Sequence, residues 1–348
     1  MALRIPLLGF DKLAGKAFPL AFHLADTDRS HSTCFPNTRT KILERIKDWA
    51  LRTAEKDKFI MWLHGAAGGG KTSIARTFAR WCDEEQGILL GEFFFSRADG
   101  TGSQYTSFAP TLAFRMAVHT LKDAKDDIAE AITQDPHIFS APLAHQLRKL
   151  VLEPLDIFIP NGITPHVIIL DGIDETLTPN EQETLLNILS TIVYQHNSRL
   201  RILICSRTEP TIVTAFNDID SALNQISFIV SLNDEGDSDS DIRRFLVERF
   251  AKIKKQLPRT PEGEWPTPDS IDYLVAKSSG QFIFAATVEK YVGSPQHKHL
   301  AIARLKHVLD LSMEQDPAKY PFSDLDALYS LILSVTIQPF LTNSFSFS

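Results

Sequence analysis

The chain has 348 residues, of which 43% are hydrophobic and 23% are charged. This length suits one large α/β domain and a smaller second domain, because single domains usually hold about 100 to 200 residues. The formal net charge of −7 gives the whole protein no attraction to nucleic acid or anionic lipid. A nucleic-acid partner is therefore not expected.

Cysteine usage and apolar run lengths indicate the compartment. The three cysteines, Cys34, Cys82 and Cys205, lie far apart and form no C-x-x-C pair, so we expect thiols in a reducing environment. No apolar run reaches the roughly 20 residues that a bilayer-spanning helix needs. We expect a cytoplasmic protein with no transmembrane segment. Residues 1–33 are expected to form a docking or poorly ordered N-terminal arm. An amphipathic membrane-surface or transit segment is the alternative.

Short apolar runs alternate with helical patterns over the first two thirds of the chain. The runs cover residues 59–63, 89–95, 167–170 and 200–205, with a fifth candidate at 226–232. Nearly continuous apolar content is typical of parallel strands covered on both faces. Helical periodicity appears at residues 72–81, 108–121, 143–152 and 181–194, as crossover connections require. The pattern predicts an α/β fold with a doubly wound, mainly parallel five-stranded sheet.

The sheet pattern ends at an acidic break over residues 233–241, where we place a domain boundary. The residues that follow predict an amphipathic helix, with Ile242, Phe245 and Phe250 on one face. A Pro-rich linker at 257–268 leads to helical patterns at 270–278, 281–291, 300–311 and 325–333. Residues 336–348 show no clear element. A small all-helical domain is therefore expected after the sheet.

The first expected strand leads into the sequence GAAGGGKT, which has the G-x-x-x-x-G-K-T pattern of a phosphate-binding loop (P-loop), and a helical pattern follows it. Glycines allow successive backbone N–H groups to turn inward around an anion, and the following helix N-terminus adds the positive end of its dipole. Lys71 is expected to reach the β- and γ-phosphates of a nucleoside triphosphate, and Thr72 to offer its hydroxyl to Mg²⁺. The predicted nucleotide contacts are Gly65, Ala66, Ala67, Gly68, Gly69, Gly70, Lys71, Thr72 and Ser73.

A second part of the site is the sequence VIILDGIDE, in which a buried strand ends at Asp171. Ligands of doubly wound sheets bind at the carboxyl ends of the strands. We predict that Asp171 belongs to the Mg²⁺ shell together with Thr72. Asp174 or Glu175 is then positioned to polarise an attacking water.

A third part is the sequence ICSR, where the expected strand at 200–205 is followed by Ser206 and Arg207. A cation at this edge of the sheet is suited to sense a γ-phosphate. An ordinary surface salt bridge is the alternative role of Arg207.

The order of P-loop, DGIDE and ICSR resembles the NACHT type of signal-transducing NTPases (STAND class), in particular the nephrocystin-like N-terminal module of fungal NLR-like proteins. The resemblance begins at CFPNTR (34–39), includes FFFSR (93–97) and SSGQFIFAA (278–286), and covers roughly residues 34–333. It implies an ASCE-type sheet in which the sensor strand lies beside the P-loop strand. It also implies a NACHT P-loop NTPase domain over 34–232, a helical lid domain over 233–312, and the start of a truncated winged-helix-like region with an irregular tail over 313–348.

The same resemblance implies residue roles. Lys71 and Thr72 would bind phosphate and Mg²⁺, Asp171 would support the metal, and Asp174 and Glu175 would assist hydrolysis. Arg207 would be the sensor arginine, and Thr38 and Arg39 would line the adenine end of the site. Relatives often carry a G-x-P turn, whereas here Gln281 and Phe282 follow Gly280, so Phe282 either stacks on the base or fills the lid core.

The sequence as a whole predicts a switch module that binds ATP or ADP with Mg²⁺ and hydrolyses ATP slowly. Self-association and NLR-like protein partners are implied by the family. The lack of an N-K-x-D motif favours adenine over guanine. Two alternatives stay open, a nucleotide-binding or degenerate scaffold without turnover and a P-loop small-molecule kinase.

Acidic residues at 237, 239, 241 and 248 have the spacing of calcium ligands in an EF-hand. However, Ile242 stands at the position where that loop needs Gly. We therefore expect a helix N-terminus rich in Asp and Ser, and no metal other than nucleotide-bound Mg²⁺.

Overall fold

The computed structural model describes residues 5–23, 33–97, 104–158, 165–195, 200–234, 238–258, 261, 263–311 and 323–342. The chain forms two compact units. The first consists of Met1–Cys34, Thr40–Ala66 and Lys71–Leu232. The second consists of Phe35–Arg39, Ala67–Gly70 and Asn233–Ser348, so two short segments from the first part of the chain are packed with the C-terminal helices.

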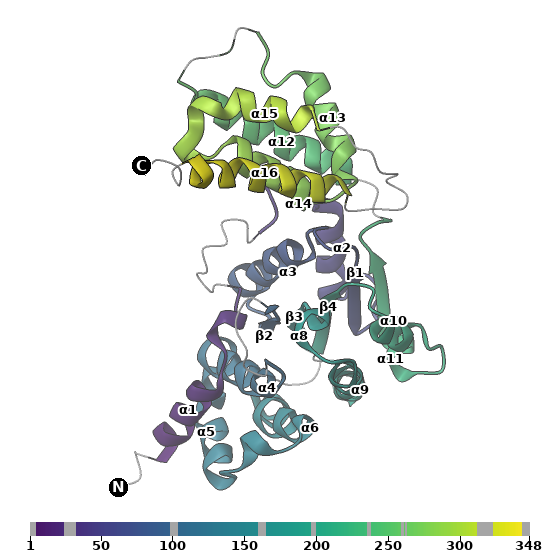
Figure 1. The fold of residues 1–348 in the computed structure, drawn as a ribbon. Coiled ribbons are helices and arrows are strands. Elements are labelled where there is room, and N and C mark those ends of the chain that lie inside the picture. Colours follow the sequence, from purple (N-terminus) through teal and green to yellow (C-terminus); the bar gives the residue numbers. More distant parts are fainter. Residues whose placement is uncertain are drawn as a thin grey trace, which may run out of the picture. The chain divides into compact units, whose positions relative to one another are not determined.

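A five-stranded parallel sheet forms the centre of the first unit (Figure 1). Its strands are β1 (Ile60–His64), β2 (Leu89–Phe94), β3 (His166–Asp171), β4 (Leu200–Ser206) and β5 (Ser227–Ser231), in the order β2-β3-β4-β1-β5. The predicted fold class is confirmed. Because β4 pairs with both β1 and β3, the strand before Arg207 lies beside the strand before the P-loop.

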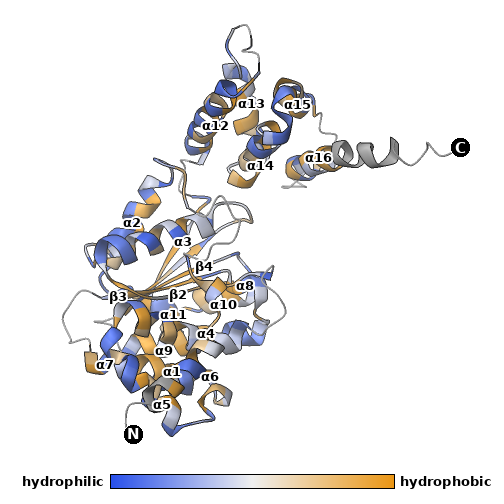
Figure 2. Cartoon of the chain, turned by 90° about the vertical axis from the view of Figure 1, so that its left-hand side faces the viewer, coloured by the Kyte–Doolittle hydropathy of each residue, from blue (hydrophilic) through white to orange (hydrophobic). Residues whose placement is uncertain are grey.

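Alternate strand residues supply two separate hydrophobic cores, because successive side chains of a strand point to opposite faces. On one face Met61 and Leu63 pack with α2 (Thr40–Ala50) and α3 (Lys71–Arg80). On the other face Ile60 and Trp62 belong to the core formed with helices α4 (Gln104–Arg115), α9 (Pro179–Gln195), α10 (Pro210–Asn217) and α11 (Ala222–Ile226). In Figure 2 hydrophobic residues lie along the strands and along the helices around the sheet. Both faces of the sheet are covered, as the apolar runs predicted.

Shorter helical segments complete the first unit. They are η1 (Pro19–Ala21), η2 (Trp81–Gln86), η4 (Met116–Thr120), η5 (Lys122–Ala124), α5 (Lys125–Gln134), η6 (Ile138–Ser140), α6 (Leu143–Leu147), η7 (Arg148–Leu152), α7 (Glu153–Phe158) and α8 (Ile173–Thr176). Three of them, η2, η4 and η7, are π-helical turns. Each continues an α-helix that the hydrophobic periodicity predicted.

The N-terminal arm contains helix α1 (Ile5–Lys16), which packs against α5 and α4. The backbones approach closely at Gly9, where an added Cβ would lie 2.1 Å from the carbonyl oxygen of Ala129. Phe10 stacks on Phe114 with ring centroids 5.5 Å apart. The described part of the arm is therefore docked on the first unit.

The second unit is built from helices. They are α12 (Ser238–Lys255), α13 (Pro268–Ser278), α14 (Phe282–Val292), η8 (Pro295–Leu300), α15 (Ala301–Leu309) and α16 (Ser323–Thr342). The predicted apolar face of α12, including Phe245 and Phe250, is buried in their shared core. No helix of the described residues is long and apolar enough to cross a membrane.

Helix α12 begins within the acidic break, and helix α16 extends beyond the last predicted helical pattern. Asp239 and Asp241 lie in the first turn of α12, as a helix N-terminus rather than a calcium loop requires, while Asp237 lies outside the described residues.

The expectation of no element over residues 336–348 was wrong up to Thr342, because α16 continues to that residue. Once a helix has nucleated, each further residue adds a hydrogen bond at little cost. Residues 343–348 lie outside the described residues.

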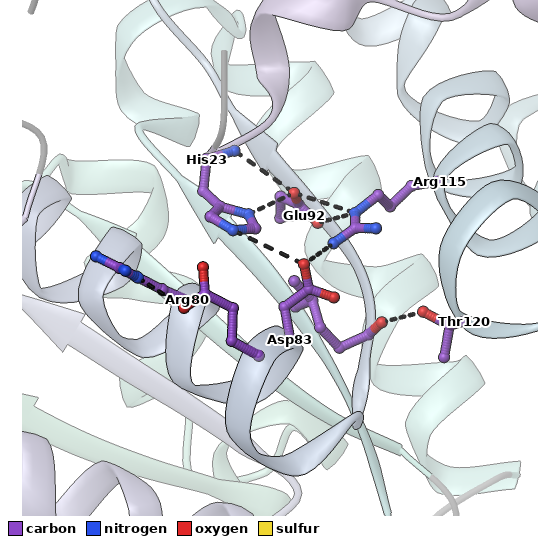
Figure 3. Close-up of polar contacts among 8 residues, drawn as sticks. His23, Arg80, Asp83, Glu92, Arg115 and Thr120 are labelled. Atoms are coloured by element: carbon purple, nitrogen blue, oxygen red, sulfur yellow. Dashed lines mark hydrogen bonds and ion pairs between the residues drawn. The ribbon is translucent and has the colours of Figure 1, made fainter. Parts of the chain in front are cut away.

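A buried polar cluster ties the arm to the sheet (Figure 3). Glu92 of β2 is fully buried, and its carboxylate lies 3.1 Å from Nε of Arg115 and 2.8 Å from Nδ1 of His23. Arg115 Nη2 also lies 2.7 Å from Asp83 Oδ2. A buried carboxylate is tolerated only when it is paired and hydrogen-bonded, so Arg115 stabilises an otherwise costly charge.

We predict that Arg115→Met lowers the free energy of unfolding by about 3–5 kcal/mol, because it leaves Glu92 buried without its cation. Adding Glu92→Gln should recover much of that loss. The control is Arg80→Met, which removes the solvent-exposed partner of Glu84 and should change stability little. Urea unfolding of the four proteins measures this, and equal losses for Arg115→Met and Arg80→Met would contradict it.

Candidate functional site

The loop between β1 and α3 has glycines where its backbone is left-handed. Gly68 has φ +74° and Gly70 has φ +94°, a region that other residues enter only at a cost. Helix α3 begins at Lys71, directly after the loop, so its first backbone N–H groups have no partners within the helix. Glycines in a left-handed backbone and an open helix start are features that anion-binding loops share.

Lys71 lies against the start of this loop. Its Nζ donates to the carbonyl oxygens of Gly65 at 2.8 Å and Ala66 at 2.9 Å. Burial lowers the pKa of Lys71, while the nearby carboxylates of Asp171 and Asp174 raise it. A partly desolvated ammonium at this position can pair with a polyanionic ligand.

Asp171 ends β3 and is 4% exposed. Burial raises the pKa of Asp171 to about 7, while a hydrogen bond with the Thr72 side chain and the ammonium of Lys71 act in the opposite direction. The sequence-predicted metal ligands, Thr72 and Asp171, are therefore adjacent. A hydroxyl and a carboxylate are oxygen donors of the kind that Mg²⁺ prefers, so the residues fit this ion.

Asp174, Glu175 and Arg207 form one group after β3 and β4. The backbone N–H of Arg207 donates to Asp174 Oδ1 at 3.1 Å, and its Nε lies 3.4 Å from Asp174 Oδ2. Arg207 Nη2 lies 3.9 Å from Glu175 Oε1. The Asp174 side chain is 3% exposed and that of Glu175 is 36% exposed, so the first carboxylate is engaged by the arginine and the second remains accessible.

Two residues to which the sequence analysis gave no role support this group through hydrogen bonds. Trp62 Nε1 donates to Ser206 Oγ at 2.8 Å, and both residues are buried. Ser206 Oγ in turn donates to the carbonyl oxygen of Arg207 at 2.9 Å. Trp62 on β1 thus helps to fix the chain at the residue that follows β4. A Trp two residues before a strand end was the only sequence signal for this role.

The remaining predicted site residues belong to the second unit. The Thr38 hydroxyl donates to the carbonyl oxygen of Phe35 at 2.6 Å and closes a turn. Arg39 contacts the loop itself, with Nη2 donating to the carbonyl oxygen of Gly69 at 2.9 Å. Phe282 packs against the helical core and lies 6.2 Å from the Phe245 ring, which agrees with the core role considered for it.

The structure thus gathers the predicted residues into two sets. Within the first unit, the set is Gly65, Ala66, Lys71, Thr72, Ser73, Asp171, Asp174, Glu175 and Arg207. Within the second, it is Thr38, Arg39, Ala67, Gly68, Gly69 and Gly70. The two sets are joined by the continuous backbone of the loop.

Residues 37–207 match the family model described as "Nephrocystin 3, N-terminal". This segment is nephrocystin-like. The match starts just before Arg39, includes the P-loop and Asp171, and ends at Arg207. It confirms the nephrocystin-like resemblance over these residues.

No curated protein matches the chain. Among solved structures, the Aeropyrum pernix ORC2 protein, described as ADPNP-ADP complexes, is similar to this chain with a TM-score of 0.47 and 13% identity. The similarity covers 82% of this chain and 75% of that chain.

We predict that Ser206→Ala lowers the free energy of unfolding by about 1–3 kcal/mol, because it leaves the buried indole N–H of Trp62 without its acceptor. The matched control is Ser227→Ala on β5, whose buried hydroxyl has no hydrogen-bond partner among the described residues. That change should leave the free energy of unfolding unchanged. Urea denaturation compares the two variants, and equal effects would mean that the Trp62–Ser206 contact does not stabilise the strand end.

Proposed function

We propose that this chain binds ATP or ADP with Mg²⁺ through the loop at residues 65–72 and works as a NACHT-type switch module that hydrolyses ATP slowly. The observation that best supports this is the position of Lys71, Thr72 and buried Asp171 together, beside a glycine loop that opens α3. Parallel α/β sheets bind ligands at this end of their strands.

Each residue has a distinct role in the proposed complex. The backbone N–H groups of the loop and the start of α3 bind phosphate oxygens, and Lys71 supplies a positive charge to the terminal phosphates. Thr72 and Asp171 would hold Mg²⁺, which neutralises phosphate charge when bound.

Hydrolysis is assigned to the acidic pair after β3. Because Asp174 is buried and contacts Arg207 twice, its role is to position that arginine. Glu175 is more exposed, so it is the group that polarises the attacking water. Arg207 contacts the γ-phosphate and distinguishes ATP from ADP.

A switch function requires that the two nucleotides favour different conformations, and a ligand shifts such an equilibrium only through different contacts in each state. Arg207 supplies such a difference, because ADP has no γ-phosphate for it to contact. Self-association or binding of NLR-like partners in the ATP state follows from the family resemblance and belongs to this proposal.

We predict that MgATP and MgADP raise the melting temperature of the chain, while MgGTP has a smaller effect. A ligand present at 100 times its dissociation constant stabilises the native state by about 2.7 kcal/mol. Lys71→Ala should abolish the shift. The control is Lys149→Ala, which removes the partner of Glu153 and should keep it. Unchanged affinity in Lys71→Ala would contradict the proposed site.

We predict that Glu175→Gln lowers ATP turnover by roughly 10²- to 10⁴-fold, because it removes the group that polarises water. Nucleotide affinity should be unchanged, and Glu183→Gln, an exposed position on α9, serves as the control. Phosphate release from labelled ATP measures the effect. Lys71-dependent binding without any turnover in the wild type would favour the scaffold alternative, and transfer of label to a small acceptor would favour the kinase alternative.

A further inference from the structure

The carbonyl groups of the P-loop tip are held by donors from elsewhere in the second unit. The backbone N–H of Ile283, at the start of α14, donates to the carbonyl oxygen of Gly68 at 3.3 Å. Arg39 Nη2 donates to the carbonyl oxygen of Gly69 at 2.9 Å. Two successive loop peptides therefore each have their oxygen fixed by an external partner.

Fixing these oxygens also fixes the N–H groups of the next residues. A trans peptide is planar, and its C=O and N–H point in opposite directions. The hydrogen bonds to Gly68 and Gly69 therefore turn the N–H groups of Gly69 and Gly70 away from Arg39 and α14. A phosphate-binding loop needs its N–H groups turned inward in this way.

Arg39 is itself held in place by several contacts. Its backbone N–H donates to Asp241 Oδ2 at 2.8 Å, and its Nη1 donates to Ser238 Oγ at 2.9 Å. Both partners lie in the first turn of α12. The guanidinium lies over the Phe282 ring, 4.9 Å from its centroid. Arg39 is 7% exposed and has φ +57°, an uncommon backbone conformation for a residue other than Gly.

We propose that Arg39 is a positioning residue for the phosphate-binding loop rather than a contact for the adenine base. It holds the Gly69 peptide in the orientation that receives phosphate, and it does so only while α12 and α14 present Ser238, Asp241 and Phe282 to it. This inference rests on the proposed nucleotide function and adds to it a route by which the helical unit controls phosphate affinity.

The contacts require an arginine in particular. The planar guanidinium can donate to Gly69 and Ser238 at once while its face lies on an aromatic ring, whereas a lysine ammonium is a point charge without that geometry. Gly68, the loop residue before Gly69, must also be a glycine. A Cβ at this position would lie 2.2 Å from Cγ2 of Ile283.

The test is calorimetric titration of the full chain with Mg²⁺ and two probes, ATP and inorganic tripolyphosphate. If Arg39 orients the loop, Arg39→Met lowers the affinity for both probes by the same factor. The loss of a charged hydrogen bond corresponds to about tenfold. Arg39→Lys should fail to restore either affinity. Arg249→Met is the control, because it removes another guanidinium of the same unit, which lies over Phe35 and Phe245.

Several outcomes would overturn the inference. If Arg39→Met weakened the binding of ATP but not of tripolyphosphate, Arg39 would belong at the adenine end. If Arg39→Lys bound both probes as tightly as the wild type, a positive charge without the guanidinium geometry would be sufficient. If the Arg39 variants do not fold, Ser238→Ala and Phe282→Leu replace them, and unchanged tripolyphosphate affinity in both would reject the proposal. If the wild-type chain bound neither probe, the proposed nucleotide function itself would be rejected. If the wild-type chain bound both probes and the Arg39 variants bound them equally well, only the positioning role of Arg39 would be rejected.

Discussion

A parallel strand that is covered on both faces can carry polar side chains cheaply only where it ends. In β1 and β3, the interior residues are buried and apolar, and unpaired charges there would be costly. Arg201, a buried charged residue inside β4, is held by hydrogen bonds to the carbonyl oxygens of Leu200 and Lys56. Asp171 and Arg207 accordingly stand at or just after strand ends, and Lys71 follows the loop that leaves β1. The core that stabilises the sheet thus also determines where charged groups gather.

Peptide geometry adds a second constraint at the loop. Backbone N–H groups can converge on an anion only if the opposite carbonyl groups find donors or water on the other side. In this chain Ile283 and Arg39 provide donors at Gly68 and Gly69. The proposed phosphate site therefore depends on residues that are distant in sequence and belong to the helical unit, which gives a physical basis for coupling nucleotide binding to that unit.

The sequence predicted the sheet because hydrophobic runs of strand length and a G-x-x-x-x-G-K-T loop are local patterns. The sequence did not predict the end of α16, which continues to Thr342. It also indicated no role for Trp62 and Ser206. The contact between those two residues joins β1 to β4, 144 positions apart. Periodicity reports which face of an element is apolar, not which polar atoms meet across the core.

The sequence by itself determined the fold class, the glycine loop after β1 and the acidic residues that follow β3, because each is encoded in a short stretch of chain. Only the tertiary structure decided the surroundings of those groups. It buried Asp174 against Arg207 while leaving Glu175 more exposed, and it brought Arg39 to Gly69 and Phe282. The physical reason is that burial and hydrogen-bond partners depend on the packing of distant segments, which no local pattern records.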